Sequence, residues 1–158
     1  MSRAILGLGA NLGDRKETLL AAVDAIGHLP KTSLLSLSGF YETEPIGVPD
    51  EQPDYLNCVA EVETQLSPEA MLGACLGIEA ALGRVRLYEK SPRVIDIDLI
   101  LYEGEQRQTE ELALPHPAML ERAFVLVPLA ELYPQRVVYG YDFSQPLEAV
   151  RGQRLRKI

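Results

Sequence analysis

The sequence predicts one α+β domain, spanning residues 1–158, in which an antiparallel or mixed sheet is covered by helices. Three observations lead to this prediction. The chain has 158 residues, of which 47% are hydrophobic, so it can bury one core but is short for two domains. Its segments alternate between the two-residue periodicity of strands and the apolar spacing of capped helices. Their order is strand, helix, strand, strand, helix, strand, followed by a weakly patterned helical tail.

The first half of the chain contains three predicted strands and one helix. Residues 3–9 form a short buried strand. Asp14 and Glu17 have the spacing of a capping box, which marks the start of a helix. Residues 32–43 and 55–64 alternate as two further strands, and the prolines and glycine between them predict an irregular loop.

The next segment contains the second helix and the last strand of the predicted sheet. Ser67 serves as a helix cap, Pro68 occupies the first helical position, and Gly83 ends the helix. Residues 84–93 are a polar loop. Residues 94–102 then have the alternation of another strand.

The C-terminal part is predicted from weaker signals. Gly104 turns the chain, so that an apolar stretch at 112–114 can return beside the strand as a hairpin. Residues 118–132 are predicted to be helical, with a break or kink at Pro128. Taken together, the order of elements is that of the ferredoxin-like arrangement.

The glycine-rich segment 7–13 does not indicate a dinucleotide site. It has the form GxGxxxG, and the acidic residue expected about 20 positions later is absent. We interpret it as a tight turn with close backbone packing.

The overall charge excludes two classes of partner. Fifteen basic and twenty-three acidic side chains give a net charge of -8. Nucleic acids and anionic membranes both require a basic surface, so neither is an expected partner. An anionic ligand must instead be bound by a local group of cations.

Cysteine usage and the N-terminal sequence predict a cytoplasmic location. Cys58 and Cys75 fall on apolar stripes without a CxxC neighbour, which is typical of reduced core residues. The chain begins without the apolar segment of a signal peptide. Its longest apolar run, at 123–130, is far shorter than a membrane span.

Asp96 and Asp98 are the first candidates for chemistry. Residues two apart on a strand share a face at about 6.6 Å, so the two carboxylates lie side by side while Ile95, Ile97, Leu99 and Leu101 face the core. Such a pair can share two magnesium ions about 3.5–4 Å apart. The alternative is an ordinary solvated face of a strand.

Five basic residues flank these aspartates in an otherwise acidic chain. Guanidinium groups remain charged and bind phosphate oxygens in a bidentate manner. Carboxylates with a metal and several arginines therefore predict a triphosphate site, although a solvated charged loop is the alternative. The flanking residues are Arg84, Arg86, Arg93, His116 and Arg122.

Three further residues are less specific candidates. Glu79 continues an apolar helical stripe, which predicts either a buried carboxylate that needs a partner or a residue at the edge of the stripe. Tyr55 and Asn57 lie two apart on one strand face, beside residues 43–46, and could together recognise a planar heterocycle. An ordinary exposed Tyr-Asn pair is the alternative.

Several motifs, in the same order along nearly the whole chain, resemble those of one enzyme family. They are GANL at 9–12, FYETEP at 40–45, QPDYLN at 52–57, GRVR at 83–86, PRVIDIDLI at 92–100, Pro115-His116, Arg122 and Phe124. The Arg-x-x-Asp-x-Asp block is the most specific of them. On these motifs the chain resembles the 6-hydroxymethyl-7,8-dihydropterin pyrophosphokinase family.

The resemblance implies a reaction and its cofactors. The expected reaction transfers the pyrophosphoryl group of ATP to the hydroxymethyl group of a reduced pterin in folate biosynthesis and releases AMP. The resemblance further implies a monomer with a ferredoxin-like fold and two Mg2+ ions. ATP and the pterin would be its partners.

The resemblance also assigns roles to residues. Asp96 and Asp98 would hold both metal ions and act in catalysis with Arg84 and Arg93. The pterin would contact Thr43, Pro45, Ile46, Tyr55, Asn57 and Phe124. ATP would contact Glu79, Arg84, Arg86, Arg93, Leu99, His116 and Arg122.

The chain departs from the family pattern mainly in one loop. Residues 86–93 contain no tryptophan, Glu44 stands where a proline is common, and Pro117 follows the histidine in place of an aromatic residue. We expect the loop at residues 86–93 to close over the triphosphate, with Tyr88 as the candidate to cover the nucleotide.

Two alternative functions remain open from the sequence. One is a non-catalytic relative that binds pterin or nucleotide, and the other is a phosphotransferase that acts on another planar alcohol.

Overall fold

The computed structural model describes residues 1–44, 54–83 and 94–158. Its main elements alternate as the sequence predicts. They are β1 (Ser2–Ala10), α1 (Arg15–Gly27), β2 (Thr32–Leu37), β3 (Tyr41–Thr43), β4 (Tyr55–Thr64), α2 (Pro68–Ala81) and β5 (Asp96–Tyr102). The C-terminal part adds β6 (Arg107–Gln108), β7 (Ala113–Leu114), the 3-10 helix η1 (Met119–Glu121), α3 (Ala123–Leu132), β8 (Val137–Val138), β9 (Tyr141–Asp142), α4 (Ser144–Ala149) and β10 (Arg156–Lys157).

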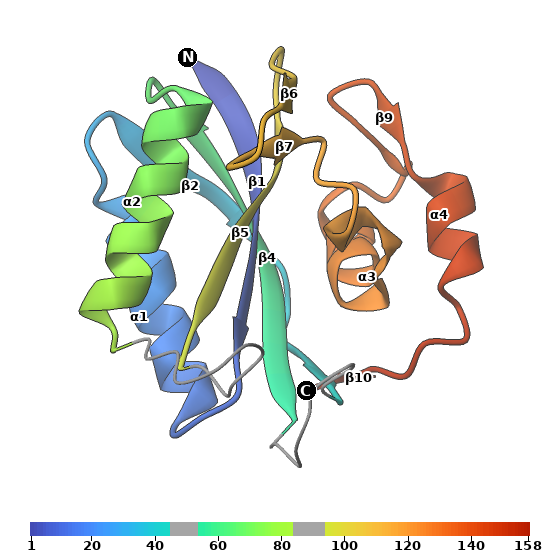
Figure 1. Cartoon of the computed structure of the whole chain (residues 1–158). Coiled ribbons are helices and arrows are strands. Elements are labelled where there is room, and N and C mark those ends of the chain that lie inside the picture. Colours follow the sequence, from blue (N-terminus) through green and yellow to red (C-terminus); the bar gives the residue numbers. More distant parts are fainter. Residues whose placement is uncertain (45–53, 84–93) are drawn as a thin grey trace.

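The central sheet has the order β10-β3-β4-β1-β5, and β2 also pairs with β4. Every strand pair described in this sheet is antiparallel. Helices α1 and α2 cover one face, and α3 lies against the other (Figure 1). The prediction of an α+β, ferredoxin-like fold is therefore confirmed.

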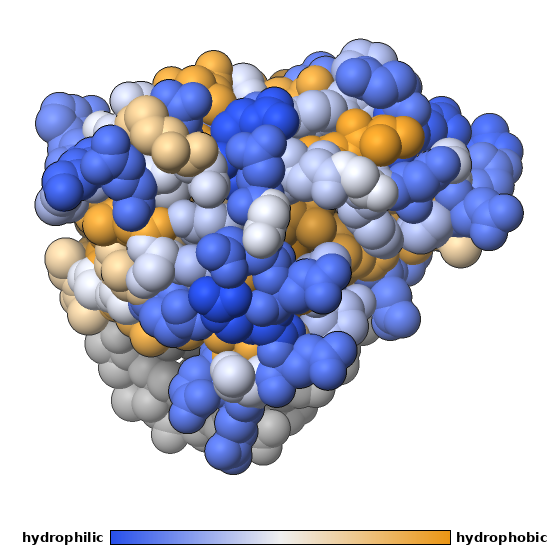
Figure 2. Space-filling model, turned by 90° about the horizontal axis from the view of Figure 1, so that it is seen from above, coloured by the Kyte–Doolittle hydropathy of each residue, from blue (hydrophilic) through white to orange (hydrophobic). Residues whose placement is uncertain are grey.

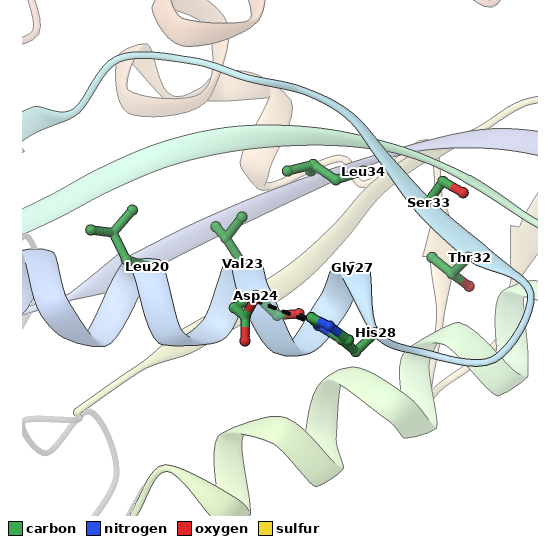
Figure 3. Close-up of a pocket in the computed structure, with 8 residues that line it drawn as sticks. All are labelled: Leu20, Val23, Asp24, Gly27, His28, Thr32, Ser33 and Leu34. Atoms are coloured by element: carbon green, nitrogen blue, oxygen red, sulfur yellow. Dashed lines mark hydrogen bonds and ion pairs between the residues drawn. The ribbon is translucent and has the colours of Figure 1, made fainter.

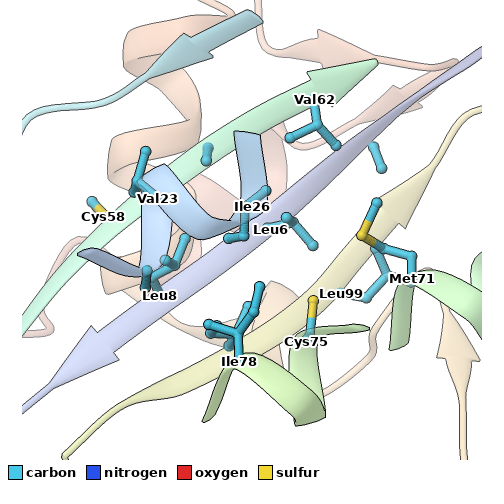
Figure 4. Close-up of a cluster of buried hydrophobic side chains, with 14 of the residues drawn as sticks. Leu6, Leu8, Val23, Ile26, Cys58, Val62, Met71, Cys75, Ile78 and Leu99 are labelled. Carbon is cyan, nitrogen blue, oxygen red and sulfur yellow. The ribbon is translucent and has the colours of Figure 1, made fainter. Parts of the chain in front are cut away.

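Two apolar clusters lie on opposite faces of this sheet. The cluster under α1 and α2 contains Leu6 and Leu8 from β1, Ile26 from α1 and Met71 from α2 (Figure 4). The second cluster joins Ile5 and other residues of the opposite face to α3 and the C-terminal segment. Alternation along the strands thus supplies apolar side chains to both clusters.

The predicted helix starts are confirmed. The Asp14 carboxylate accepts a hydrogen bond from the Glu17 backbone N–H at 3.1 Å, and Ser67 Oγ accepts one from the Ala70 N–H at 3.1 Å. Each bond satisfies a backbone donor that has no partner within the helix. The last described residue after α2, Gly83, has φ +88°, a conformation that glycine adopts without strain.

One predicted strand is divided in the structure. Residues 32–43 form β2 and β3, with a short interruption between them. At this point Ser38 Oγ accepts a hydrogen bond from the Val59 N–H at 2.9 Å, and the Gly39 N–H donates to the Glu131 carboxylate of α3 at 3.0 Å. These bonds redirect the backbone toward α3, and sequence periodicity gives no sign of them.

Leu101 is buried in the core, as predicted, but not on the expected face of the sheet. Ile97 and Leu99 pack under α1 and α2, as expected, but Leu101 joins the opposite cluster. The register between β1 and β5 shifts by one residue next to Ile5, so Ile100 and Leu101 both reach the α3 side. An inserted residue of this kind reverses the alternation beyond it.

The C-terminal part differs most from the prediction. The apolar stretch near 113 pairs with β6 in a separate hairpin, not with β5. The helix continues through Pro128, so a break there is wrong, whereas the alternative of a kink stays a prediction. The chain is extended at Arg122, with φ -119° and ψ 132°. Pro128 is itself buried in this helix, together with Val125, Leu126 and Leu129, and we attribute the continuity of α3 to this burial.

Strand β10 is a second feature that the sequence did not predict. It pairs with β3 and extends the main sheet by one strand, close to the C-terminus.

Among the residues that the structure describes, no helix has the length and apolar composition that a membrane span requires.

Candidate active site

The candidate site lies at one end of the sheet face that α3 covers in part. Gly9 of β1 is paired with Asn57 of β4 on one side and with Asp96 of β5 on the other. Residues paired in this way share a face, so the amide and the carboxylate lie on either side of a residue without a side chain. The sheet register therefore brings two sequence-predicted site residues together.

Gly9 is required by the close approach of Asn57. A Cβ atom at this position would lie 2.8 Å from Asn57 Oδ1, which is shorter than real contacts allow. The predicted tight turn at residues 7–13 is wrong in its first part, because Gly7 and Gly9 lie within β1. Only Gly13 in this segment has a positive φ, at +67°.

Asn57 is held in place by Thr43. Its Nδ2 donates to Thr43 Oγ1 at 2.8 Å, and the two side chains are buried. This bond fixes the plane of the amide beside Gly9. Tyr55, two residues away, is half-buried on the same face, as the strand period predicts.

Asp96 and Asp98 form the predicted carboxylate pair at the start of β5. Both are half-buried, whereas Ile97 and Leu99 between and beyond them are buried under the helices. Within residues 1–44, 54–83 and 94–158, no three His, Cys, Asp or Glu side chains are grouped as a metal site. Mg2+ typically takes one or two carboxylates and completes its shell with water and substrate phosphates, so this pair fits that ion.

Glu79 is buried, as its place on the apolar stripe predicted. Its Oε2 accepts a hydrogen bond from the Ile97 backbone N–H at 2.6 Å, between the two aspartates. One partner of this carboxylate is thus a backbone N–H group. The sequence suggests an arginine or a ligand for this role. Leu99 is buried in the core, so the groups of this residue that could meet a nucleotide are those of its main chain.

His116 is attached to β5 just beyond the aspartates. Its backbone N–H donates to the Ile100 carbonyl at 2.9 Å, and its Nδ1 accepts from the Met119 N–H at 3.3 Å. Burial lowers the pKa of His116 below its ordinary value of 6.5. The neutral ring therefore carries its hydrogen on Nε2, which can donate to an anion.

Arg122 is a half-buried cation at the start of α3. Its guanidinium lies 4.5 Å from the centre of the Phe124 ring, and no carboxylate among the described residues forms an ion pair with it. Burial lowers the pKa of Arg122, but guanidinium groups stay protonated. The positive charge is thus available to a bound anion.

The remaining predicted site residues cannot be placed. Pro45, Ile46, Arg84, Arg86 and Arg93 lie outside the described residues, as does the proposed lid at 86–93 with Tyr88. Their roles stay predictions.

A cavity of about 510 Å³ lies elsewhere, between α1 and β2 (Figure 3). Within it, the Asp24 carboxylate lies 3.5 Å from His28 Nδ1. Its lining contains none of the predicted site residues. The lining residues are Leu20, Val23, Asp24, Gly27, His28, Thr32, Ser33 and Leu34.

Comparison with known proteins shows the family of the whole chain. The family model described as 7,8-dihydro-6-hydroxymethylpterin-pyrophosphokinase matches residues 5–134. A 2-amino-4-hydroxy-6-hydroxymethyldihydropteridine pyrophosphokinase from Methylorubrum extorquens is 49% identical over 158 residues, covering 100% of this chain and 99% of that protein. The protein of the same name from Haemophilus influenzae is 46% identical, covering 84% of this chain and 82% of its own.

Solved structures share the fold. An HPPK-DHPS structure from Plasmodium falciparum superposes with a TM-score of 0.70 at 13% identity, covering 93% of this chain. This chain spans 45% of that longer protein. At such identity the likeness concerns the fold alone, whereas the family model and the bacterial relatives concern the sequence itself. The chain therefore belongs to the 7,8-dihydro-6-hydroxymethylpterin-pyrophosphokinase family.

Proposed function

We propose that this site transfers the pyrophosphoryl group of ATP to the hydroxymethyl group of 6-hydroxymethyl-7,8-dihydropterin and releases AMP, a step of folate biosynthesis. Membership of the family supports the reaction. The observation that carries the proposal is the placement of Asn57 and Asp96 on either side of Gly9. A group that recognises a heterocycle thereby adjoins a group that binds a metal.

The pterin is recognised by the β3 and β4 side of the site. The Asn57 amide, held by Thr43, can donate and accept hydrogen bonds along the edge of a pterin ring. The rings of Tyr55 and Phe124 provide aromatic faces for stacking. Pro45 and Ile46 are included in this proposal from the family pattern alone.

Asp96 and Asp98 hold two Mg2+ ions in this proposal. The support is their spacing on one strand face and their partial exposure. When bound, such ions offset phosphate charge and lower the pKa of a coordinated hydroxyl group.

The phosphates are held by cations on both sides of the aspartates. His116, whose backbone is bonded to Ile100 of β5, donates from Nε2, and Arg122 contributes a charge that lacks an acidic partner among the described residues. Arg84, Arg86 and Arg93 join them by the family pattern, and Glu79 and Leu99 lie toward the adenosine. Phosphoryl transfer depends mainly on position and charge, so these groups suffice without a dedicated base.

One assay tests the reaction and both alternatives. The purified chain is incubated with ATP, MgCl2 and 6-hydroxymethyl-7,8-dihydropterin, and the nucleotides are separated by chromatography. We expect AMP and the pterin diphosphate in equal amounts, and no product when EDTA removes the metal. Formation of ADP would indicate an ordinary phosphotransferase, and absence of turnover would indicate a relative that only binds.

Three further properties belong to the proposal. The chain is a single domain, because both apolar clusters share one sheet. The resemblance to the family makes it a monomer in this proposal; on the face seen from above, apolar side chains form small patches among hydrophilic ones (Figure 2). It acts in the cytoplasm, where its free, buried cysteines Cys58 and Cys75 would stay reduced. Light scattering coupled to gel filtration measures the oligomeric state.

A further inference from the structure

Arg15 bridges two chain segments at the end of the candidate site. It is the first residue of α1, and its guanidinium reaches β3 and the start of β4. Nη2 lies 2.7 Å from Glu42 Oε2, and Nη1 donates to the Asp54 carbonyl at 3.0 Å. Because the guanidinium group is rigid and planar, its two hydrogen bonds fix the relative positions of the two acceptors.

The bridge lies where strand pairing stops. Thr43 and Tyr55 are the last paired residues of β3 and β4. Glu42 immediately precedes Thr43, and Asp54 immediately precedes Tyr55. Arg15 therefore joins the neighbours of two proposed pterin-binding residues.

Arg15 acts from the opposite side of the sheet. Tyr41 contacts Glu131 of α3, so Tyr41 and Thr43 face the candidate site. Glu42, between them, points to the α1 side, where Arg15 meets it. An effect of Arg15 on pterin binding therefore cannot come from direct contact with a ligand on the α3 side.

We infer that Arg15 is a positioning residue for the pterin site: its bridge between Glu42 and Asp54 sets the spacing of Thr43, Tyr55 and Asn57. This inference rests on the proposed function, because it concerns the same site. The sensitive contact is the Asn57 to Thr43 hydrogen bond of 2.8 Å, which a shift of β3 against β4 would lengthen. Displacements of about 1 Å can change binding and rates considerably.

A second arginine supplies a matched control. Arg156 of β10 also binds Glu42, with Nη2 2.7 Å from Oε1, but it makes no bond to Asp54 among the contacts described. Its side chain is 74% exposed, against 29% for Arg15. The hydrogen bond from Arg15 is also the largest cause of the lowered pKa of Glu42. Removing Arg156 thus loosens β10 without opening the β3–β4 bridge.

The test compares Arg15→Ala, Arg15→Lys and Arg156→Ala with the unmodified protein. KM is measured separately for the pterin and for ATP, with thermal unfolding as a check on folding. For Arg15→Ala we expect the pterin KM to rise about 5- to 20-fold, with the ATP KM changed by less than about 2-fold. Arg15→Lys should fall between, because one ammonium group cannot reproduce the planar guanidinium group. Arg156→Ala should change the pterin KM by less than about 2-fold.

Two results would overturn the inference. One is a pterin KM that stays the same in Arg15→Ala, and the other is an equal effect of Arg15→Ala and Arg156→Ala, which would reduce Arg15 to a general stabilising contact. If Arg15→Ala does not fold, Arg15→Lys carries the same comparison. An unmodified protein that binds no pterin and makes no AMP would refute the proposed function itself, and this inference with it.

Discussion

The two ends of one sheet face use carboxylates in opposite ways. At one end, Glu61 of β4 is buried and accepts hydrogen bonds from the hydroxyl groups of Tyr133 and Tyr139, the latter at 2.5 Å. At the other end, Asp96 and Asp98 are half-buried at the start of β5. Strands β4 and β5, which carry these carboxylates, belong to the same sheet and are separated by β1.

The difference lies in what the C-terminal segment places over each end. It brings two tyrosines onto Glu61, and the guanidinium of Arg3 lies 5.1 Å from the Tyr139 ring. Burial first, and then Glu61, raises the pKa of both tyrosines, so they stay protonated donors. A carboxylate enclosed by donors serves the fold, whereas a partly exposed pair can bind cations and a substrate.

The largest effect should come from the end of the sheet that carries Asp96 and Asp98, which we call the open end. We expect Asp96→Ala to lower kcat by about 1000-fold or more, because it removes a charge that holds the metal and the triphosphate. Thermal stability should change little, since Asp96 is half-exposed. Steady-state AMP formation and calorimetric unfolding measure the two quantities. Normal turnover of this variant in magnesium would remove Asp96 from the site.

The end that carries Glu61, which we call the closed end, should lose stability rather than catalytic rate when its carboxylate is removed. Glu61→Ala leaves two partly buried hydroxyl groups without their acceptor, so the free energy of unfolding should fall by about 2–4 kcal/mol. Glu63→Ala, two residues along β4 and half-buried, is the matched control and should cost under about 1 kcal/mol. Urea unfolding gives both values. Loss of kcat without loss of stability in Glu61→Ala would contradict the contrast between the two ends.

A smaller effect is expected at the border between α3 and the open end. Phe124→Ala should weaken pterin binding by about 1–3 kcal/mol through lost stacking. Phe124 also lies against Arg122, so binding of a nonhydrolysable ATP analogue should fall by no more than about 0.5–1 kcal/mol. Calorimetry with each ligand separates the two effects. Equal losses for both ligands would show that Phe124 supports the fold rather than the pterin.

The smallest effect concerns pH. Burial lowers the pKa of His116 below 6.5, so the unfolded chain takes up this proton first as the pH falls. Stability should therefore decrease with acidification below about pH 6.5, until the folded-state pKa is passed. NMR titration of a His28→Gln variant observes His116 alone, because the chain has 2 histidines. A titration midpoint at or above 6.5 without ligand would contradict the burial of this ring.

The local features of the site follow from short stretches of sequence. Helix caps at Asp14 and Ser67, and the shared face of Asp96 and Asp98, follow from interactions within a few residues. The buried position of Glu79 also followed from helical periodicity. Such features are set by backbone geometry that each segment carries with it.

Which of these features meet depends on long-range packing. The partners Asn57 and Gly9, Arg15 and Glu42, and Glu61 and Tyr139 lie far apart in the sequence. Their pairing depends on strand register and on the helices and C-terminal segment that pack over the sheet. One shifted residue reverses the face of every residue beyond it, as Leu101 shows. Local periodicity cannot fix such a register, because burial of the whole sheet between its helices selects it.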